Sequence, residues 1–192
     1  MARTVVVKGA VIEGAEAVPV DVAVDVSQGV PGISLKGVRD INALEIRQAV
    51  RTAMRAQGYT VPGESIQVEL ACADGFERKF QGPFSSPWGL ALPIALGVMA
   101  ASGEIDGRLL EGRLFYGSLD IGGNVVHQKG AIAVSELCRG LGLEAVVSSA
   151  TPIRYRPSSM PLIGMDSISR QAIMGHNLEP RRVPERPEQI GS

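Results

Sequence analysis

The chain has 192 residues, a formal net charge of −1 and hydrophobic residues at 45% of its positions. This size predicts one domain, or one domain with an extension, and the composition is that of a globular protein. The nearly neutral charge excludes a global attraction to nucleic acid or acidic lipid. The N-terminus has neither the apolar core nor the cleavage site of a signal peptide, so we expect a cytoplasmic protein with no membrane partner.

Cysteine and histidine usage predicts neither a metal site nor a bound cofactor. Cys72 and Cys138 form no disulfide or metal pattern with close partners, and we expect both to be reduced and buried. His127 and His176 are isolated and lack neighbours with metal-ligand spacing. The chain also contains no Walker A sequence, which excludes nucleotide hydrolysis of the P-loop type.

The N-terminal region predicts three strands. Thr4–Ile12 is rich in valine, and Val18–Val26 alternates at a period of two, with valines on one face and Asp21 and Asp25 on the other. These two segments predict an antiparallel hairpin, and Ile33–Gly37 predicts a further short strand. The aspartates are too far apart on a strand to hold one ion alone, so we interpret them as a polar sheet face.

A helix follows, beginning at a cap supplied by Asp40 or Asn42 and running to about Gln57, before Gly58. Apolar residues at helical spacing predict its buried stripe, which consists of Ile46, Ala49, Val50, Ala53 and Met54.

Three arginines, Arg47, Arg51 and Arg55, form a second stripe at steps of four along this helix. Such charge runs are usually solvated faces. The alternative is that the stripe binds phosphates, which would make the chain a direct DNA-binding module. Both interpretations remain open on the sequence.

After a predicted strand at Ser65–Ala71, the chain has its longest apolar run. From Trp88 to Ala101 no side chain is charged or carries a hydroxyl. The run is too short to span a bilayer and too long for a buried strand. It predicts the central core helix, beginning near Ala91 or Leu92, with Pro93 in its first turn, and ending at Gly103.

The loop before this helix contains Gly82-Pro-x-Ser-Ser and raises a catalytic alternative. Ser85 or Ser86 could be a nucleophile, with Lys129 as the base of a Ser-Lys peptidase. A lysine base works only where burial lowers its pKa. The commoner role of serines before a helix is to form turns and cap backbone amides.

The second half of the chain predicts a strand at Leu114–Ile121, a hairpin turn into Val125–Val126, a helix over residues 130–140 and a buried strand at Ala145–Ser148. Hairpins mixed with helical crossovers predict an α/β domain with two layers and a mixed sheet.

The character of the chain changes after residue 152. We predict a main domain over residues 1–155 and an extension over 156–178. The extension contains a short helix over Ser167–Met174, capped by Asp166. The tail, residues 179–192, is expected to be disordered.

Four segments together carry a family resemblance. Gly29–Val38 is similar to G-L-P-x-F-x-I-V-G-L, Glu45–Ala53 to E-S-R-E-R-V-R-A-A, Leu92–Gly103 to L-P-I-A-L-G-x-L-A-A-S-G, and Gly117–Gly123 to G-E-L-S-L-D-G. As a set they resemble the N-terminal domain of the magnesium-chelatase-like ComM/YifB proteins.

This resemblance implies that residues 1–155 have the fold of the Lon proteolytic domain, which is the ribosomal protein S5 domain 2-like fold. In that family the domain precedes an AAA+ ATPase that works as a hexameric DNA helicase. The resemblance therefore implies an interaction or assembly module with a protein partner, such as an AAA+ ATPase, or self-association. DNA remains a possible partner.

The chain departs from the family pattern by an insertion at residues 75–91, which produces a loop similar to the G-P-S-A-G loop around the Lon nucleophile. Aligning Gly117–Gly123 with the Lon hairpin puts Ile132 at the catalytic lysine position, and Lys129 falls three residues early. The resemblance therefore implies that the Ser-Lys dyad is absent and that the domain is not catalytic.

Overall fold

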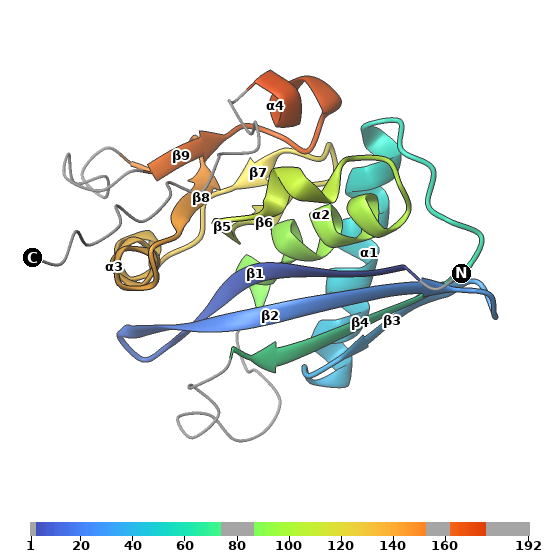
Figure 1. Ribbon diagram of the computed structural model, residues 1–192, viewed down its shortest axis with the longest axis horizontal. Helices are drawn as coiled ribbons and strands as arrows, with labels where there is room; N and C mark the ends of the chain where they lie inside the picture. The colour runs from blue at the N-terminus through green and yellow to red at the C-terminus, as the bar shows by residue number, and fades with distance from the viewer. Residues whose placement is uncertain (1–2, 74–86, 153–161, 176–192) are drawn as a thin grey trace, which may run out of the picture.

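The computed structural model describes residues 3–73, 87–152 and 162–175 (Figure 1). Within these residues a mixed sheet of seven strands has the order β3-β4-β2-β1-β5-β8-β9, and β6 and β7 form a separate two-stranded sheet. This confirms the predicted α/β class. The strands are β1 Arg3–Glu13, β2 Glu16–Ser27, β3 Gly32–Lys36, β4 Ser65–Cys72, β5 Arg113–Tyr116, β6 Ser118–Leu119, β7 Val125–Val126, β8 Glu144–Ser148 and β9 Leu162–Met165.

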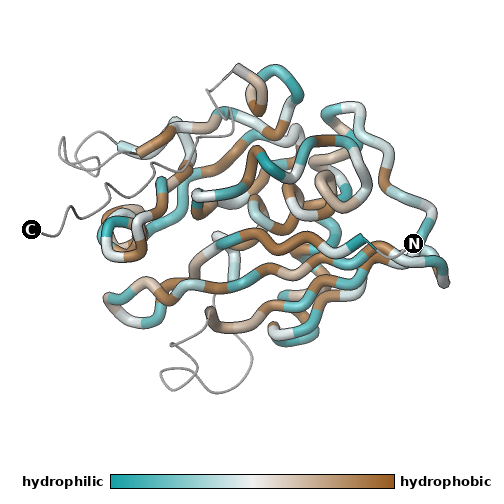
Figure 2. The backbone as a smooth tube through the Cα atoms, in the orientation of Figure 1, coloured by the Kyte–Doolittle hydropathy of each residue, from teal (hydrophilic) through white to brown (hydrophobic). Residues whose placement is uncertain are grey.

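The predicted hairpin of β1 and β2 is confirmed, with antiparallel pairing from Arg3↔Val26 to Glu13↔Glu16. The five alternating valines of β2 are at most 4% exposed, and hydrophobic residues are concentrated along the strands in Figure 2. On the opposite face Asp21 pairs with Lys8 at 2.5 Å, and Asp25 accepts a hydrogen bond from Thr4. These contacts confirm the polar sheet face.

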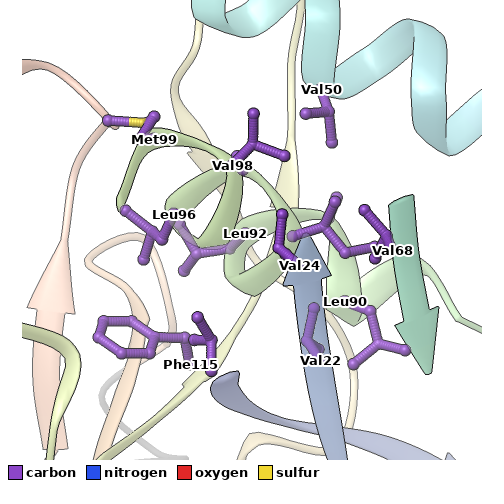
Figure 3. Close-up of a cluster of buried hydrophobic side chains, with 14 of the residues drawn as sticks. Val22, Val24, Val50, Val68, Leu90, Leu92, Leu96, Val98, Met99 and Phe115 are labelled. Atoms are coloured by element: carbon purple, nitrogen blue, oxygen red, sulfur yellow. The ribbon is translucent and has the colours of Figure 1, made fainter. Parts of the chain in front are cut away.

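Helix α2, Ala91–Ala101, is the predicted core helix, and every residue in it except Ala100 is buried. Leu92, Leu96, Val98 and Met99 lie among side chains from the sheet and from helix α1 (Figure 3). A Cβ atom at Gly97 would lie 2.7 Å from Cγ2 of Val24. Because glycine has no side chain, it lets α2 lie close against β2.

A short 3₁₀ helix leads into α2, and the predicted capping by Ser85 or Ser86 stays untested. Leu90 is the N-cap residue and ends a short 3₁₀ helix, Trp88–Leu90. The amide of Leu92 donates to the carbonyl of Gly117 at 3.1 Å. Ser85 and Ser86 lie outside the described residues.

Helix α1, Asp40–Ala56, connects β3 to the parallel strand β4. The predicted capping by Asp40 or Asn42 is wrong, because Arg39 is the N-cap and Asp40 lies in the first turn, where a carboxylate favours the positive end of the helix dipole. The predicted end is confirmed: Gly58 has a φ of 79°, which glycine adopts without strain.

Helix α3, Ala131–Leu141, adds a second covered face to the sheet. On β5 the side chain of Phe115 packs with α2, whereas Leu114 and Tyr116 pack with Val134 and Cys138 of α3. Since neighbouring side chains on a strand point to opposite faces, α3 and α2 lie on opposite sides of the sheet (Figure 1).

The predicted single strand Leu114–Ile121 is wrong, because the strand is interrupted at Gly117. The amide of Gly117 donates to Gly89 and its carbonyl accepts from Leu92, so the backbone turns away from β8 toward the start of α2. Strand β6 then pairs with β7 through the predicted hairpin, whose turn is held by Asp120 accepting from the amides of Gly122 and Asn124.

Strand β9 was not predicted and pairs parallel to β8 at the edge of the sheet. The predicted short helix is α4, Arg170–Gly175. Its predicted cap, Asp166, is wrong: the Ser169 hydroxyl accepts from the amide of Ala172 at 3.1 Å, while the Asp166 carboxylate accepts from the Ser149 hydroxyl.

Candidate functional site

A groove of about 280 Å³ lies between strand β3, at the edge of the sheet, and helix α1. Strand β3 supplies Gly32 and Ile33 to its wall. The helix supplies four side chains, Leu44, Arg47, Gln48 and Arg51. The groove therefore contains two of the three arginines that the sequence singled out.

The geometry of the helix explains why the third arginine is excluded. Each step of four residues advances about 40° beyond a full turn, so the arginine stripe rotates away from the buried stripe. Arg47 and Arg51 are half-buried, whereas Arg55, one turn further on, is exposed. The structure thus brings Arg47 and Arg51 together at the groove and turns Arg55 to solvent.

The arginines of the groove have no acidic partner among the described residues. Arg47 donates from Nη1 to the carbonyl of Ile33 at 3.1 Å, and its buried Nε has no hydrogen-bond partner among the described residues. In the described part of the chain, no carboxylate lies within 4.0 Å of Arg47, Arg51 or Arg55. The groove lining carries two positive charges and no negative one, which favours an anionic ligand.

Lys129, the alternative catalytic base, lies in the turn between β7 and α3 and is exposed. Its carbonyl accepts a hydrogen bond from the hydroxyl of Tyr116, and burial raises the pKa of Tyr116 to about 12. Ile132, which the family resemblance aligns with the Lon lysine, is 37% exposed in the first turn of α3. With Ser85 and Ser86 outside the described residues, the pairing of serine and lysine stays an untested prediction.

The other reactive groups are dispersed. Burial raises the pKa of the Cys138 thiol to about 12, whereas Cys72 is only half-buried. Across residues 3–73, 87–152 and 162–175, no three His, Cys, Asp or Glu side chains are grouped so as to hold a metal ion. No helix in the same residues is long and apolar enough to cross a membrane.

Sequence reasoning missed the exposed apolar residues at and beside the groove. Ile41 and Leu44 lie one turn apart on α1, and they are 69% and 48% exposed. Their spacing places them on the same side of α1 as Gln48 and Arg51, outside the buried stripe. Two exposed apolar residues at this spacing were the signal that could have indicated a binding face.

Taken together, these features define a mixed α/β domain with a cationic groove beside an edge strand. Residues 22–151 match the protein family described as subunit ChlI of Mg-chelatase. This segment reaches from β2 to the end of β8 and includes α1, α2 and α3. The chain therefore belongs to the ChlI family of Mg-chelatase subunits.

Curated relatives agree with this assignment. The chain is 30% identical over 136 residues to the uncharacterized protein YifB of Salmonella typhimurium, covering 71% of this chain and 25% of that protein. It is 32% identical over 120 residues to YifB of Escherichia coli, covering 62% of this chain and 22% of that protein. The chain is 33% identical over 119 residues to the competence protein ComM of Haemophilus influenzae, covering 62% of this chain and 22% of that protein. The resemblance to ComM and YifB is confirmed, and the match spans about a quarter of these relatives.

Proposed function

We propose that this chain is a non-catalytic, cytoplasmic Lon-like domain that serves as an interaction or assembly module of an AAA+ ATPase of the ComM and Mg-chelatase-like group, or of a DNA-processing system. The observation that carries the proposal is the extent of the family match. The matched segment is only 22–25% of each relative, so it corresponds to one part of a longer protein.

The site supports an interaction role over a catalytic one. Lys129 is exposed, whereas a lysine acting as a general base needs burial. The groove between β3 and α1 is suited to such a role, because its half-buried arginines have no acidic partner in the described part of the chain.

A chimera tests the assembly role. The region of Escherichia coli YifB matched here, 22% of that protein, is replaced by this chain. We expect the chimera to contain the same number of subunits as intact YifB, given by the mass from light scattering divided by the subunit mass, and we expect a deletion of the region to contain fewer subunits. If the deletion variant assembles as the intact protein does, the region is not an assembly module.

The Ser-Lys peptidase is the alternative that the site does not favour. We expect no turnover of unfolded casein by the chain. Turnover that disappears both in Ser85→Ala/Ser86→Ala and in Lys129→Ala would overturn the non-catalytic assignment, as would covalent labelling of either serine by a serine-directed reagent.

Direct DNA binding is a second candidate, favoured by the absence of carboxylates near Arg47, Arg51 and Arg55 in the described residues. Fluorescence anisotropy with single- and double-stranded DNA tests it. If the stripe binds DNA, affinity should fall steeply with salt and should drop when the three arginines become alanine. Absence of binding at low salt would leave the stripe without a role in binding DNA.

A further inference from the structure

The outer edge of strand β3 has unpaired backbone groups. The amide of Gly32 donates to the carbonyl of Glu64, so Gly32 and the alternate residues after it face β4. In a parallel pair the residues between them direct their amides and carbonyls the other way. The backbone amides and carbonyls of Ile33 and Leu35 therefore face outward, away from β4. In the described part of the chain no strand pairs with this edge.

One of these outward backbone groups already accepts a hydrogen bond from a side chain. The Ile33 carbonyl accepts from Arg47, at 3.1 Å. The amide of Ile33 and both backbone groups of Leu35 have no such partner among the described residues. These three groups can bind an extended chain, with one residue opposite Leu35 making two hydrogen bonds.

The side chains next to the edge define what such a chain must carry. Toward the start of α1 the wall is apolar: Leu44 lines the groove and is 48% exposed, and Ile41, one turn before Leu44, is 69% exposed. Toward its middle the wall is cationic, with Arg47 and Arg51 half-buried and unpaired with acids in the described residues. Arginine binds carboxylates through two parallel N–H groups, so acidic side chains fit this end.

We propose that strand β3 and the groove beside α1 bind an extended, acidic segment of a partner protein by β-strand addition. The segment pairs with the backbone of Leu35 and the amide of Ile33. It directs carboxylates to Arg47 and Arg51 and an apolar side chain to Leu44. The proposal rests on the proposed function as an interaction module and names its surface and partner class.

Two other occupants fit the groove less well. A nucleic acid would satisfy the arginines, but its backbone cannot continue a β-ladder, and it would leave Leu44 and Ile41 against phosphates. A second copy joined edge to edge about a two-fold axis would bring the same patch onto itself, so the arginines of one copy would face those of the other. An acidic peptide satisfies the backbone edge, the apolar wall and the charge at once.

The test is an NMR titration of the full chain, labelled with ¹⁵N, with an acetylated peptide about eight residues long that contains Val-x-Glu-x-Glu, with serine at each x, so that the valine and both glutamates lie on one face of the strand. We expect the amide signals of Ile33 and Leu35 to shift on binding. Arg51→Gln should weaken binding about tenfold or more, because it removes a charge-assisted hydrogen bond. The matched control is Arg55→Gln, on the same helix but outside the groove, which should change the affinity by less than about twofold.

Controls on the peptide separate strand addition from charge attraction. N-methylation of the valine and of both glutamates removes the donors that face β3 and should abolish the shifts, and the same peptide with lysine in place of both glutamates should not bind. The proposal is overturned if Leu35 does not shift, if Arg51→Gln and Arg55→Gln weaken binding equally, or if an oligothymidylate shifts these amides while the peptide does not. Concentration-dependent shifts of Leu35 without peptide would assign the edge to a second copy instead.

The two proposals can fail separately. A YifB chimera that assembles while the peptide leaves Leu35 unchanged would retain the assembly role and reject this binding site. Binding of the peptide at Leu35 by a chain whose YifB chimera does not assemble would retain the site and reject the assembly role.

Discussion

Replacing Gly97 by alanine tests whether the close contact between α2 and β2 determines stability. The added Cβ atom would lie 2.7 Å from Cγ2 of Val24 and 3.3 Å from Cγ2 of Val7, whereas ordinary contacts begin at about 3.4 Å. Val24 is fully buried and Val7 is 1% exposed, so neither can swing into solvent. The helix must move away from the sheet, or the valines must leave their preferred rotamers.

Two opposing effects set the size of the change. Overpacking a dense core costs about 1–3 kcal/mol. Alanine in a helix interior is favoured over glycine by about 0.5–1 kcal/mol. We therefore expect Gly97→Ala to lower the free energy of unfolding by roughly 1–2 kcal/mol.

Urea denaturation followed by circular dichroism measures this change, and Gly140→Ala is its matched control. Gly140 lies in α3, and an added Cβ atom there would meet nothing within 4 Å. The control should gain about 0.5–1 kcal/mol, because only the helix preference acts. Combining Gly97→Ala with Val24→Ala removes the clashing methyl group, so the double variant should lose less than the two single losses added together.

The reasoning is refuted if Gly97→Ala stabilises the chain as much as Gly140→Ala does. That result would mean that α2 and β2 accommodate the added Cβ atom without lowering the free energy of unfolding. Additive losses in the double variant would show that the Val24 methyl group is not the obstacle.

Three further predictions concern the core, a buried ion pair and a turn. Leu96→Asp would bury an unpaired charge and should abolish cooperative unfolding; an unchanged melting temperature would show that α2 is not central. Arg113, 2% exposed, pairs with Glu144 at 3.2 Å, so Arg113→Met should cost about 3–5 kcal/mol in chemical denaturation, with partial recovery on adding Glu144→Gln. Hydrogen bonds, chiefly those from Asn124, lower the pKa of Asp120 below its usual 3.8. The ionised Asp120 should therefore stabilise the fold at neutral pH, and this stabilisation should be lost as acid protonates the carboxylate. In Asp120→Asn, the acid dependence of the free energy of unfolding should lack this contribution.

The sequence by itself determined the elements whose patterns reflect local burial. Alternating valines on Val18–Val26 require a strand with one buried face, and the uncharged run from Trp88 to Ala101 requires a helix covered on every side. Gly58 ends α1 because the backbone there adopts a positive φ. These features depend on neighbours within a few residues, so periodicity and residue type suffice to predict them.

The tertiary structure decided the features that depend on distant partners. The break at Gly117 arises because its backbone groups bond to Gly89 and Leu92, far from it in the chain. The pairing of β9 with β8 and the position of α3 on the second face likewise follow from the order of strands in the sheet, which no local pattern specifies.

The candidate site divides in the same way. The sequence identified three arginines at steps of four, but it could not show that only Arg47 and Arg51 line a groove. That distinction depends on β3 being an edge strand and on α1 crossing beside it, with Arg47 bonded to Ile33. Helical spacing gives the angle between side chains around one axis, whereas packing against the sheet determines which of those angles is covered and which faces solvent.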